Sequence, residues 1–157
     1  MEFIDLLLKT IALRPYVFVF LAVFLFLASR LIGWRRTGYF MGITFIVAFL
    51  CEFSSTHIGI PFGWYHYTGS TVGEELYMLN VPFMDSLSFP FLLYASYCMA
   101  LAFLLPAESM KNSSPGINLV RMGFPLTART GWPAMLLTML FFTYLDIVID
   151  PVTLRGE

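Results

Sequence analysis

Long apolar runs divide this chain, and four of them are candidates for helices that cross a lipid bilayer. They cover residues 15–34, 38–53, 86–107 and 131–150. A spanning helix needs about 20 mostly apolar residues. Pro15 and Pro133 fit the first turn of a helix, where a missing N–H costs nothing. Pro90 falls in the first turns of the third run, so we expect it to start or kink that helix and not to break its centre.

Residues 1–13 carry a different pattern, in which apolar side chains share one face of a predicted helix. These side chains are Phe3, Ile4, Leu7, Leu8 and Ile11. The pattern predicts either an interfacial helix or an early extension of the first span. It does not indicate a secretory signal, because the start is acidic and no small-residue cleavage site follows the apolar run.

Two long connections separate the apolar runs. Residues 108–130 are rich in Ser, Pro and Gly, which predicts a loop. Residues 54–85 are rich in aromatic residues, Gly and Pro. Connections longer than about 15 residues are usually functional or disordered, and this composition is not that of a disordered segment. We therefore expect residues 54–85 to form a structured, functional loop.

Composition narrows the class of protein. The chain has 157 residues, of which 59% are hydrophobic and only 12% are charged, and its formal net charge is -1. A disordered chain would be more polar, and a nucleic-acid-binding protein would carry a basic surplus for phosphates. A soluble globule could not keep so much apolar surface in water with so few charges. The chain is therefore predicted to be an all-α polytopic membrane helix bundle, with residues 1–157 as a single integral membrane domain.

The distribution of Lys and Arg predicts the orientation of these helices. The connections on one side hold Arg30, Arg35, Arg36, Lys111, Arg121 and Arg129. The opposite side holds Lys9, Arg14 and Arg155, whereas residues 54–85 contain no Lys or Arg. Because cytoplasmic loops carry the excess of Lys and Arg, both termini and the 54–85 connection are predicted to lie outside the cytoplasm of a prokaryotic cell.

This topology places several ionisable residues at one side of the membrane. Glu52 ends the second predicted span, Asp85 opens the third, and His57 and His66 lie in the connection between them. Acids within membrane segments are functional by default, although snorkelling of Glu52 to the interface is an alternative. Two histidines without a third ligand in register do not indicate a metal site, so none is predicted.

Asp146 and Asp150 end the fourth predicted span and are four residues apart, so they share one helix face. Two like charges at that spacing oppose each other's ionisation, and a pair of carboxyl groups that shares a proton can act as an acid with its conjugate base. The alternative is that both residues mark the solvated end of a helix, since Pro151 fits a helix terminus.

The stretch 59–68, GIPFGWYHYT, is the most distinctive in the chain. Its proline and glycines predict a turn. The aromatic residues around that turn are Phe62, Trp64, Tyr65 and Tyr67. An aromatic belt at the lipid headgroups is one explanation. Beside acids, aromatic faces can instead stabilise a cation, including the tertiary carbocation that forms when an acid protonates an alkene.

These residues together resemble one protein family. The shared pattern has Glu52, then GIPFGWYHY at 59–67, then Val81-Pro82, then Asp146 and Asp150-Pro151-Val152. It is similar to the membrane carotenoid-biosynthesis family that includes the carotenoid 1,2-hydratases and bisanhydrobacterioruberin hydratase. The resemblance extends from the second predicted span to the C-terminus. Members of that family are longer, so the resemblance implies that this chain lacks the family's C-terminal part.

The resemblance implies a hydro-lyase of carotenoid biosynthesis that works without a cofactor. Such an enzyme adds water across the terminal C1,2 double bond of an acyclic carotenoid end group. Its substrate would be a carotenoid or another polyene lipid, with membrane lipid around it, and it would be able to associate with other enzymes of the same pathway. No nucleic-acid partner is expected, because the chain has no basic surplus.

Chemistry then suggests a role for each candidate residue. The expected catalytic residues are Asp146, Asp150, Glu52, His57 and Tyr65. In this interpretation Asp146, with Asp150 as its partner, protonates the alkene, and Glu52 orients or deprotonates the attacking water. The expected substrate-binding residues are Phe62, Trp64, His66, Tyr67 and Asp85.

Two other functions stay open at this point. A carotenoid end-group cyclase would form the same cation and quench it with a second double bond. Glu74-Glu75 superficially resembles the acidic motif of small membrane cyclases, but the preceding proline is absent. A non-catalytic membrane subunit or a small transporter is the other alternative. A transporter is disfavoured because no charged residue lies at mid-membrane and no span is broken at its centre.

Overall fold

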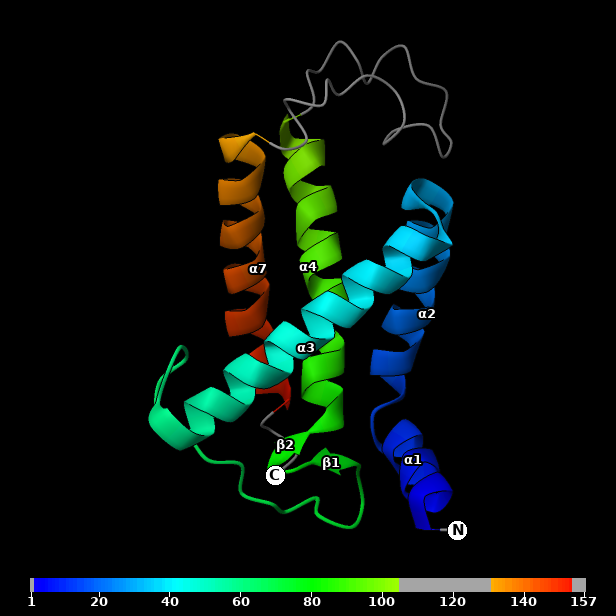
Figure 1. Ribbon diagram of the computed structural model, residues 1–157, viewed down its shortest axis with the longest axis vertical. Helices are drawn as coiled ribbons and strands as arrows, with labels where there is room; N and C mark the ends of the chain where they lie inside the picture. The colour runs from blue at the N-terminus through cyan, green and yellow to red at the C-terminus, as the bar shows by residue number, and fades with distance from the viewer. Residues whose placement is uncertain (1, 105–130, 154–157) are drawn as a thin grey trace. The chain divides into compact units, whose positions relative to one another are not determined.

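The computed structural model describes the backbone of residues 2–104 and 131–153 and the side chains of residues 3–104 and 131–149. The chain is mostly helical (Figure 1). Its elements are α1 (Glu2–Leu13), α2 (Pro15–Ile32), α3 (Trp34–Ile58), β1 (Tyr77–Met78), β2 (Val81–Pro82), α4 (Phe83–Leu104) and α7 (Trp132–Thr153). Four of the described helices, α2, α3, α4 and α7, are long and apolar enough to cross a membrane. This confirms the predicted class of a helical polytopic membrane protein.

The helix boundaries differ from the predicted spans where local capping decides them. Only Gly33 separates α2 from α3, and its φ of 86° lies where glycine is favoured. Gly59 ends α3 in the left-handed conformation, with its N–H donated to the Ser55 carbonyl. The second span therefore covers Trp34–Ile58 instead of 38–53. Glu52 consequently lies inside a helix and not at its end.

Two further boundaries change the surroundings of candidate residues. His57, which was expected in the connection, lies in the last turn of α3. Asp85, which was expected to open the third span, lies in the first turn of α4, where an acid complements the helix dipole. Nearer the N-terminus, Arg14 separates α1 from α2, so Glu2–Leu13 forms a separate helix instead of an extension of the first span. The loop predicted at 108–130 lies outside the described residues.

The chain divides into two compact units, of which the first extends to Phe91. In this unit α2 and α3 form a helical hairpin, with the rings of Phe24 and Phe40 6.1 Å apart. The first turns of α4 pack on the same hairpin, since the Phe45 and Phe83 rings lie 5.4 Å apart and the Phe20 and Phe91 rings 5.9 Å apart. These contacts surround a core of small and apolar side chains.

The second unit contains the rest of α4, from Leu92, together with α7. The Phe103 and Phe141 rings meet edge to face at 6.3 Å. The small side chains Ser96, Ala100, Ala134 and Thr138 are buried. Small residues of this kind let membrane helices approach closely.

The connection between α3 and α4 is structured, as predicted, but it contains a short β-ladder that the sequence did not indicate. Strands β1 and β2 pair antiparallel, with Met78 opposite Val81. Leu79, in the turn between the strands, has a φ of 57°, which is unusual for a residue with a side chain. The ladder leads directly into α4, so it sets where that helix begins and where Asp85 lies in its first turn.

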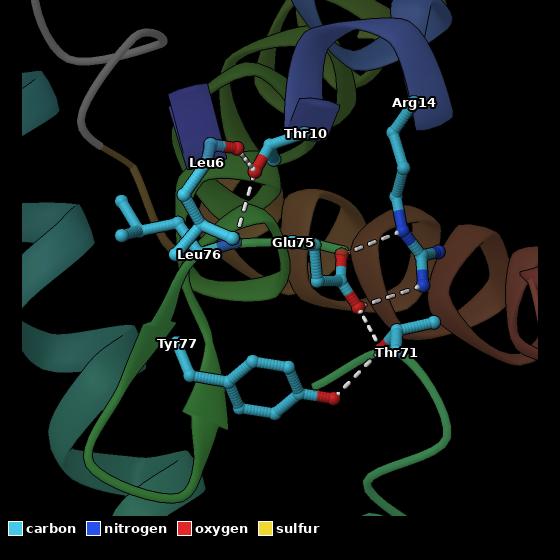
Figure 2. Close-up of polar contacts among 7 residues, drawn as sticks. All are labelled: Leu6, Thr10, Arg14, Thr71, Glu75, Leu76 and Tyr77. Atoms are coloured by element: carbon cyan, nitrogen blue, oxygen red, sulfur yellow. Dashed lines mark hydrogen bonds and ion pairs between the residues drawn. The ribbon is translucent and has the colours of Figure 1, made fainter. Parts of the chain in front are cut away.

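A buried polar network fastens this connection to α1 (Figure 2). The Arg14 guanidinium donates to both carboxylate oxygens of Glu75, with Nε 3.0 Å from Oε2 and Nη2 3.4 Å from Oε1. Thr71 donates to the same carboxylate at 2.5 Å. The Thr10 hydroxyl accepts the Leu76 N–H at 2.8 Å. Because α1 and the connection lie at the same end of the α2–α3 hairpin, these contacts hold the loop beside the site described next.

Candidate functional site

The centre of the candidate site is the carboxylate of Glu52 on α3. This side chain is 8% exposed and shares its helix face with the buried residues Ala48, Ser55 and Thr56. Its Oε2 atom accepts a hydrogen bond from the Tyr67 hydroxyl at 2.8 Å and another from the Tyr65 hydroxyl. Two phenol donors thus hold one carboxylate oxygen, which compensates for taking an acid out of water.

The two tyrosines come from the segment that follows the turn after α3. Residues two apart in an extended segment point to the same side, which lets both Tyr65 and Tyr67 reach α3. Their rings lie 5.5 Å apart and meet edge to face at 79°. Gly63 precedes the pair with a φ of 99°, a backbone conformation that glycine adopts without strain. The chain reverses here so that positions 13 and 15 residues after Glu52 contact it.

Both phenols are held in their neutral, hydrogen-donating form. Burial raises the pKa of Tyr65 above its ordinary value, and its hydrogen bond to Glu52 and the charge of Glu52 raise it further. Burial also raises the pKa of Tyr67, and the negative charges of Asp85 and Glu52 add to this effect. The two tyrosines are therefore hydrogen-bond donors across the physiological pH range.

Asp85 is the second acid of this cluster. It lies in the first turn of α4 and is half-buried. Its charge is close enough to contribute to the raised pKa of Tyr67. Tyr67 thus lies between two acids, one on each of two membrane helices. We call Glu52, Tyr65, Tyr67 and Asp85 the carboxylate–phenol cluster.

Other residues that the sequence suggested lie apart from this cluster. His57 is exposed, and its Nδ1 atom lies 2.8 Å from the Phe53 carbonyl and 3.1 Å from the Thr56 hydroxyl. His66 is exposed as well. In the part of the chain that the structure describes, neither histidine hydrogen-bonds to Glu52.

Trp64 and Phe62 make contacts with other residues instead of Glu52. The Trp64 indole packs on Gly59, where an added Cβ would meet its Nε1 atom at 2.6 Å. The Phe62 ring lies 6.4 Å from the Phe89 ring on α4. Trp64 is 69% exposed and Phe62 is 50% exposed. Of the aromatic residues at 59–68, only the two tyrosines contact the buried acid.

Asp146 and Asp150 belong to the second unit. Both lie on α7, four residues apart, and Asp146 is half-buried. The helix continues to Thr153, so Asp146 lies two turns before its end and Asp150 is still helical. The side chain of Asp150 lies outside the described residues. Convergence of these acids with Glu52 stays a prediction from topology.

Three polar residues near the site were not among the site residues expected from the sequence. Asn80 donates to the Thr56 hydroxyl at 2.8 Å, one helical turn from Glu52, which joins the β-turn to α3. Arg14 and Glu75 form the buried ion pair. Burial alone would lower the pKa of Arg14, but hydrogen bonds to Tyr16 and Glu75 raise it, so the guanidinium stays charged. Two sequence features could have indicated this ion pair. Arg14 directly precedes the first predicted span, and Glu75 lies in a connection that contains no Lys or Arg of its own.

Among the described residues, no group of three or more His, Cys, Asp and Glu side chains is arranged to hold a metal ion.

Comparison with known proteins identifies a family. Searches of curated proteins and of solved structures gave no match. A family model described as carotenoid biosynthesis protein matches residues 4–157.

Proposed function

Because this chain belongs to the carotenoid biosynthesis protein family, we propose that it adds water across the terminal C1,2 double bond of an acyclic carotenoid end group. The observation that carries the proposal is the buried Glu52 carboxylate, which accepts hydrogen bonds from Tyr65 and Tyr67. A desolvated carboxylate in a fixed orientation is suited to accept a proton from water. Its position on a membrane helix suits a substrate that is dissolved in lipid.

The proposed reaction balances without an oxidant or reductant. A carboxyl group donates a proton to C2 of the alkene, which forms a C–H bond and leaves a tertiary cation at C1. A water oxygen then bonds to C1, and Glu52 takes the proton that this water releases. Proton exchange with solvent restores both acids. The sum is one water added, so the chemistry requires no redox cofactor.

We propose Asp146 as the proton donor and Asp150 as its partner, since like carboxyl groups four residues apart on a helix favour one shared proton. In this scheme Asp85 would help to hold the substrate end group near Tyr67. The face of the Tyr65 ring would stabilise the cation, because aromatic faces attract positive charge. His57 and His66 would exchange protons with solvent, which their exposure supports.

The remaining aromatic residues, Phe62, Trp64 and Tyr67, would contact the polyene. Their rings offer apolar surface beside the acids, and a conjugated chain would pack on such surface. The proposal includes association with other enzymes of carotenoid biosynthesis, because a membrane-bound polyene passes between enzymes that act in the same bilayer.

The decisive experiment expresses the chain in a host that makes lycopene and measures the mass of the pigments. A gain of one water per modified end group supports the hydratase. An isomer of unchanged mass would instead identify a cyclase, and unchanged pigment would contradict an enzyme that acts on this substrate. The host without the chain is the reference.

Variants of Glu52 and Asp146 test the assigned residues in the same host, and a variant of Glu74 is the control. Glu52→Gln should lower hydration by about 100-fold, the lower range of general acid–base effects. In contrast, Glu74→Gln, at an exposed glutamate of the connection between α3 and α4, should leave it unchanged. Asp146→Asn should abolish the gain of water. Full activity in Asp146→Asn would contradict its assignment as proton donor, and full activity in Glu52→Gln would contradict the proposed site.

A further inference from the structure

We propose that the turn at residues 59–64, here called the aromatic turn, inserts into the lipid at the membrane interface and binds the boundary between headgroups and acyl chains. Three large apolar side chains of this turn are exposed: Ile60 by 63%, Phe62 by 50% and Trp64 by 69%. Exposed apolar side chains in such density are unfavourable in water but suit the interface, where Trp is enriched.

The exposed surface of the aromatic turn continues the lipid-facing surface of α3. The large apolar side chains exposed along that helix are Ile43, Ile46, Val47, Leu50 and Ile58. Spacings of three, four and seven residues place the first four in one stripe, and Ile58 extends it to the last residue of the helix. Glu52, nine residues after Ile43, lies on the opposite face. The stripe therefore leads directly into the turn, which begins at Gly59, one residue after Ile58.

The distribution of charged residues also favours lipid as the partner of the aromatic turn. Residues 53–73 contain no Asp, Glu, Lys or Arg, so nothing in the aromatic turn requires full hydration. In contrast, the exposed face of α1 carries Lys9 and Asp5, which pair at 3.2 Å. A surface that lacks charge and follows a membrane span is complementary to lipid and not to a polar protein partner.

The turn is also held in a defined shape. Its first residue donates to the Ser55 carbonyl at 3.0 Å, and the Phe62 N–H donates to the Ser55 hydroxyl at 3.0 Å. The Trp64 indole rests on Gly59. Non-helical backbone is not tolerated against lipid in the hydrocarbon core, so the interface is the depth at which such a turn can insert.

This proposal does not depend on the reaction proposed above. Tyr65 follows Trp64 directly and donates to Glu52. An inserted turn would therefore place the carboxylate–phenol cluster next to lipid. A substrate dissolved in the bilayer could then reach the cluster without crossing water, whatever chemistry follows.

Tryptophan fluorescence tests the insertion directly. The chain has three Trp residues, and the double variant Trp34→Phe/Trp132→Phe leaves Trp64 as the single probe. The protein is reconstituted in phosphatidylcholine vesicles with bromine either near the headgroups or near the chain ends. We expect loss of most Trp64 fluorescence with shallow bromine, a smaller loss with deep bromine, and little quenching by aqueous acrylamide. Strong acrylamide quenching without bromine quenching would overturn the proposal.

Substitutions in the turn provide the matched comparison. In the single-Trp protein, Ile60→Ser with Phe62→Ser should reduce quenching by shallow bromine and increase quenching by acrylamide. Val72→Ser, which removes an exposed apolar side chain outside the turn, should change neither. If Val72→Ser changed the quenching as much as Ile60→Ser with Phe62→Ser, the apolar side chains of the turn would not be what anchors Trp64 in lipid. Circular dichroism of each variant reports whether the helices are retained.

Discussion

Glu52 shows how a single acid is accommodated in an apolar helix. An unpaired carboxylate in a membrane segment costs several kcal/mol, and the cost falls when donors replace water. Here the donors are two phenols that approach from a distant segment, and they leave the second carboxylate oxygen, Oε1, outside these two bonds. The residue-level chemistry of the site therefore depends on Tyr65 and Tyr67 remaining neutral.

Ionisation of these tyrosines at high pH is the first prediction. Their pKa values are raised in the folded protein, so their contribution to stability is complete below the ordinary tyrosine pKa of about 10 and is lost as the pH rises through the folded values. An ultraviolet titration of tyrosinate in detergent should show a late phase that is absent from the unfolded chain. Tyr67→Phe should reduce that late phase. If Tyr67→Phe reduced only the early phase, the assignment of a raised pKa to Tyr67 would be contradicted.

At the scale of elements, the connection between α3 and α4 depends on α1. The ion pair of Arg14 with Glu75 joins the two, and Glu75 is 1% exposed while Arg14 is 15% exposed. A buried pair adds little net stability compared with apolar side chains, but breaking it leaves one charge without compensation. The pair consequently specifies one position of the loop against α1.

Breaking the ion pair gives the second prediction. Arg14→Gln should lower the free energy of unfolding by about 3 to 5 kcal/mol, because Glu75 would remain buried without its cation. The double variant Arg14→Gln/Glu75→Gln should cost less than Arg14→Gln alone. Denaturation of the protein in mixed detergent micelles measures both values.

The exposed ion pair on α1 supplies the control for this experiment. Lys9 and Asp5 have side chains that are 54% and 67% exposed. Lys9→Gln should therefore change the free energy of unfolding by less than about 1 kcal/mol. Equal losses in Lys9→Gln and Arg14→Gln would show that burial of Glu75 does not set the cost.

The junction between α3 and the aromatic turn gives the third prediction. Gly59 has a φ of 75°, and an added Cβ would meet the Trp64 indole at 2.6 Å. Gly59→Ala should therefore cost more than the roughly 1–2 kcal/mol of a left-handed residue alone, and it should shift the fluorescence of Trp64. Gly42→Ala, inside α3 with open space around it, should be neutral or stabilising by up to about 1 kcal/mol. A neutral Gly59→Ala would contradict the close packing of Trp64.

At the scale of the whole molecule, charge is divided between the two ends of the α2–α3 hairpin. Arg30 ends α2, with its guanidinium 5.2 Å from the centre of the Phe26 ring, and Arg35 and Arg36 begin α3. The other end holds α1 and the connection that contributes Tyr65 and Tyr67 to the carboxylate–phenol cluster. By the positive-inside rule, we infer that the arginine end is cytoplasmic.

Labelling of single cysteines tests this orientation as the fourth prediction. In a protein with Cys51 and Cys98 replaced by Ser, Val72→Cys should react with a membrane-impermeant maleimide in intact cells, because Val72 is 67% exposed in the connection. Trp34→Cys, which is exposed at the α2–α3 junction, should react only after permeabilisation. The reverse pattern would invert the topology.

The four members of the carboxylate–phenol cluster were among the candidate residues from the sequence, but their arrangement could not be predicted. Glu52, Tyr65, Tyr67 and Asp85 each stood out in the sequence, because acids and aromatic residues are conspicuous in a chain with 12% charge. The sequence did not show that Tyr65 and Tyr67 contact Glu52, because these contacts depend on a chain reversal at 59–64. Tyr67 was expected to bind substrate, and the structure places its hydroxyl on Glu52.

Long apolar runs by themselves determined the helical membrane class and the four spanning helices of the described residues, because a bilayer requires long apolar segments that satisfy their own backbone. The positions of the charged residues were also sufficient to show that acids are scarce and that Glu52 and Asp85 lie at the opposite ends of the predicted spans from Arg30, Arg35 and Arg36. Only the tertiary structure decided that α3 continues to Ile58 and that Glu75 pairs with Arg14. Those features depend on local capping and on contacts between residues up to 61 positions apart, which no local pattern of apolar and polar residues encodes.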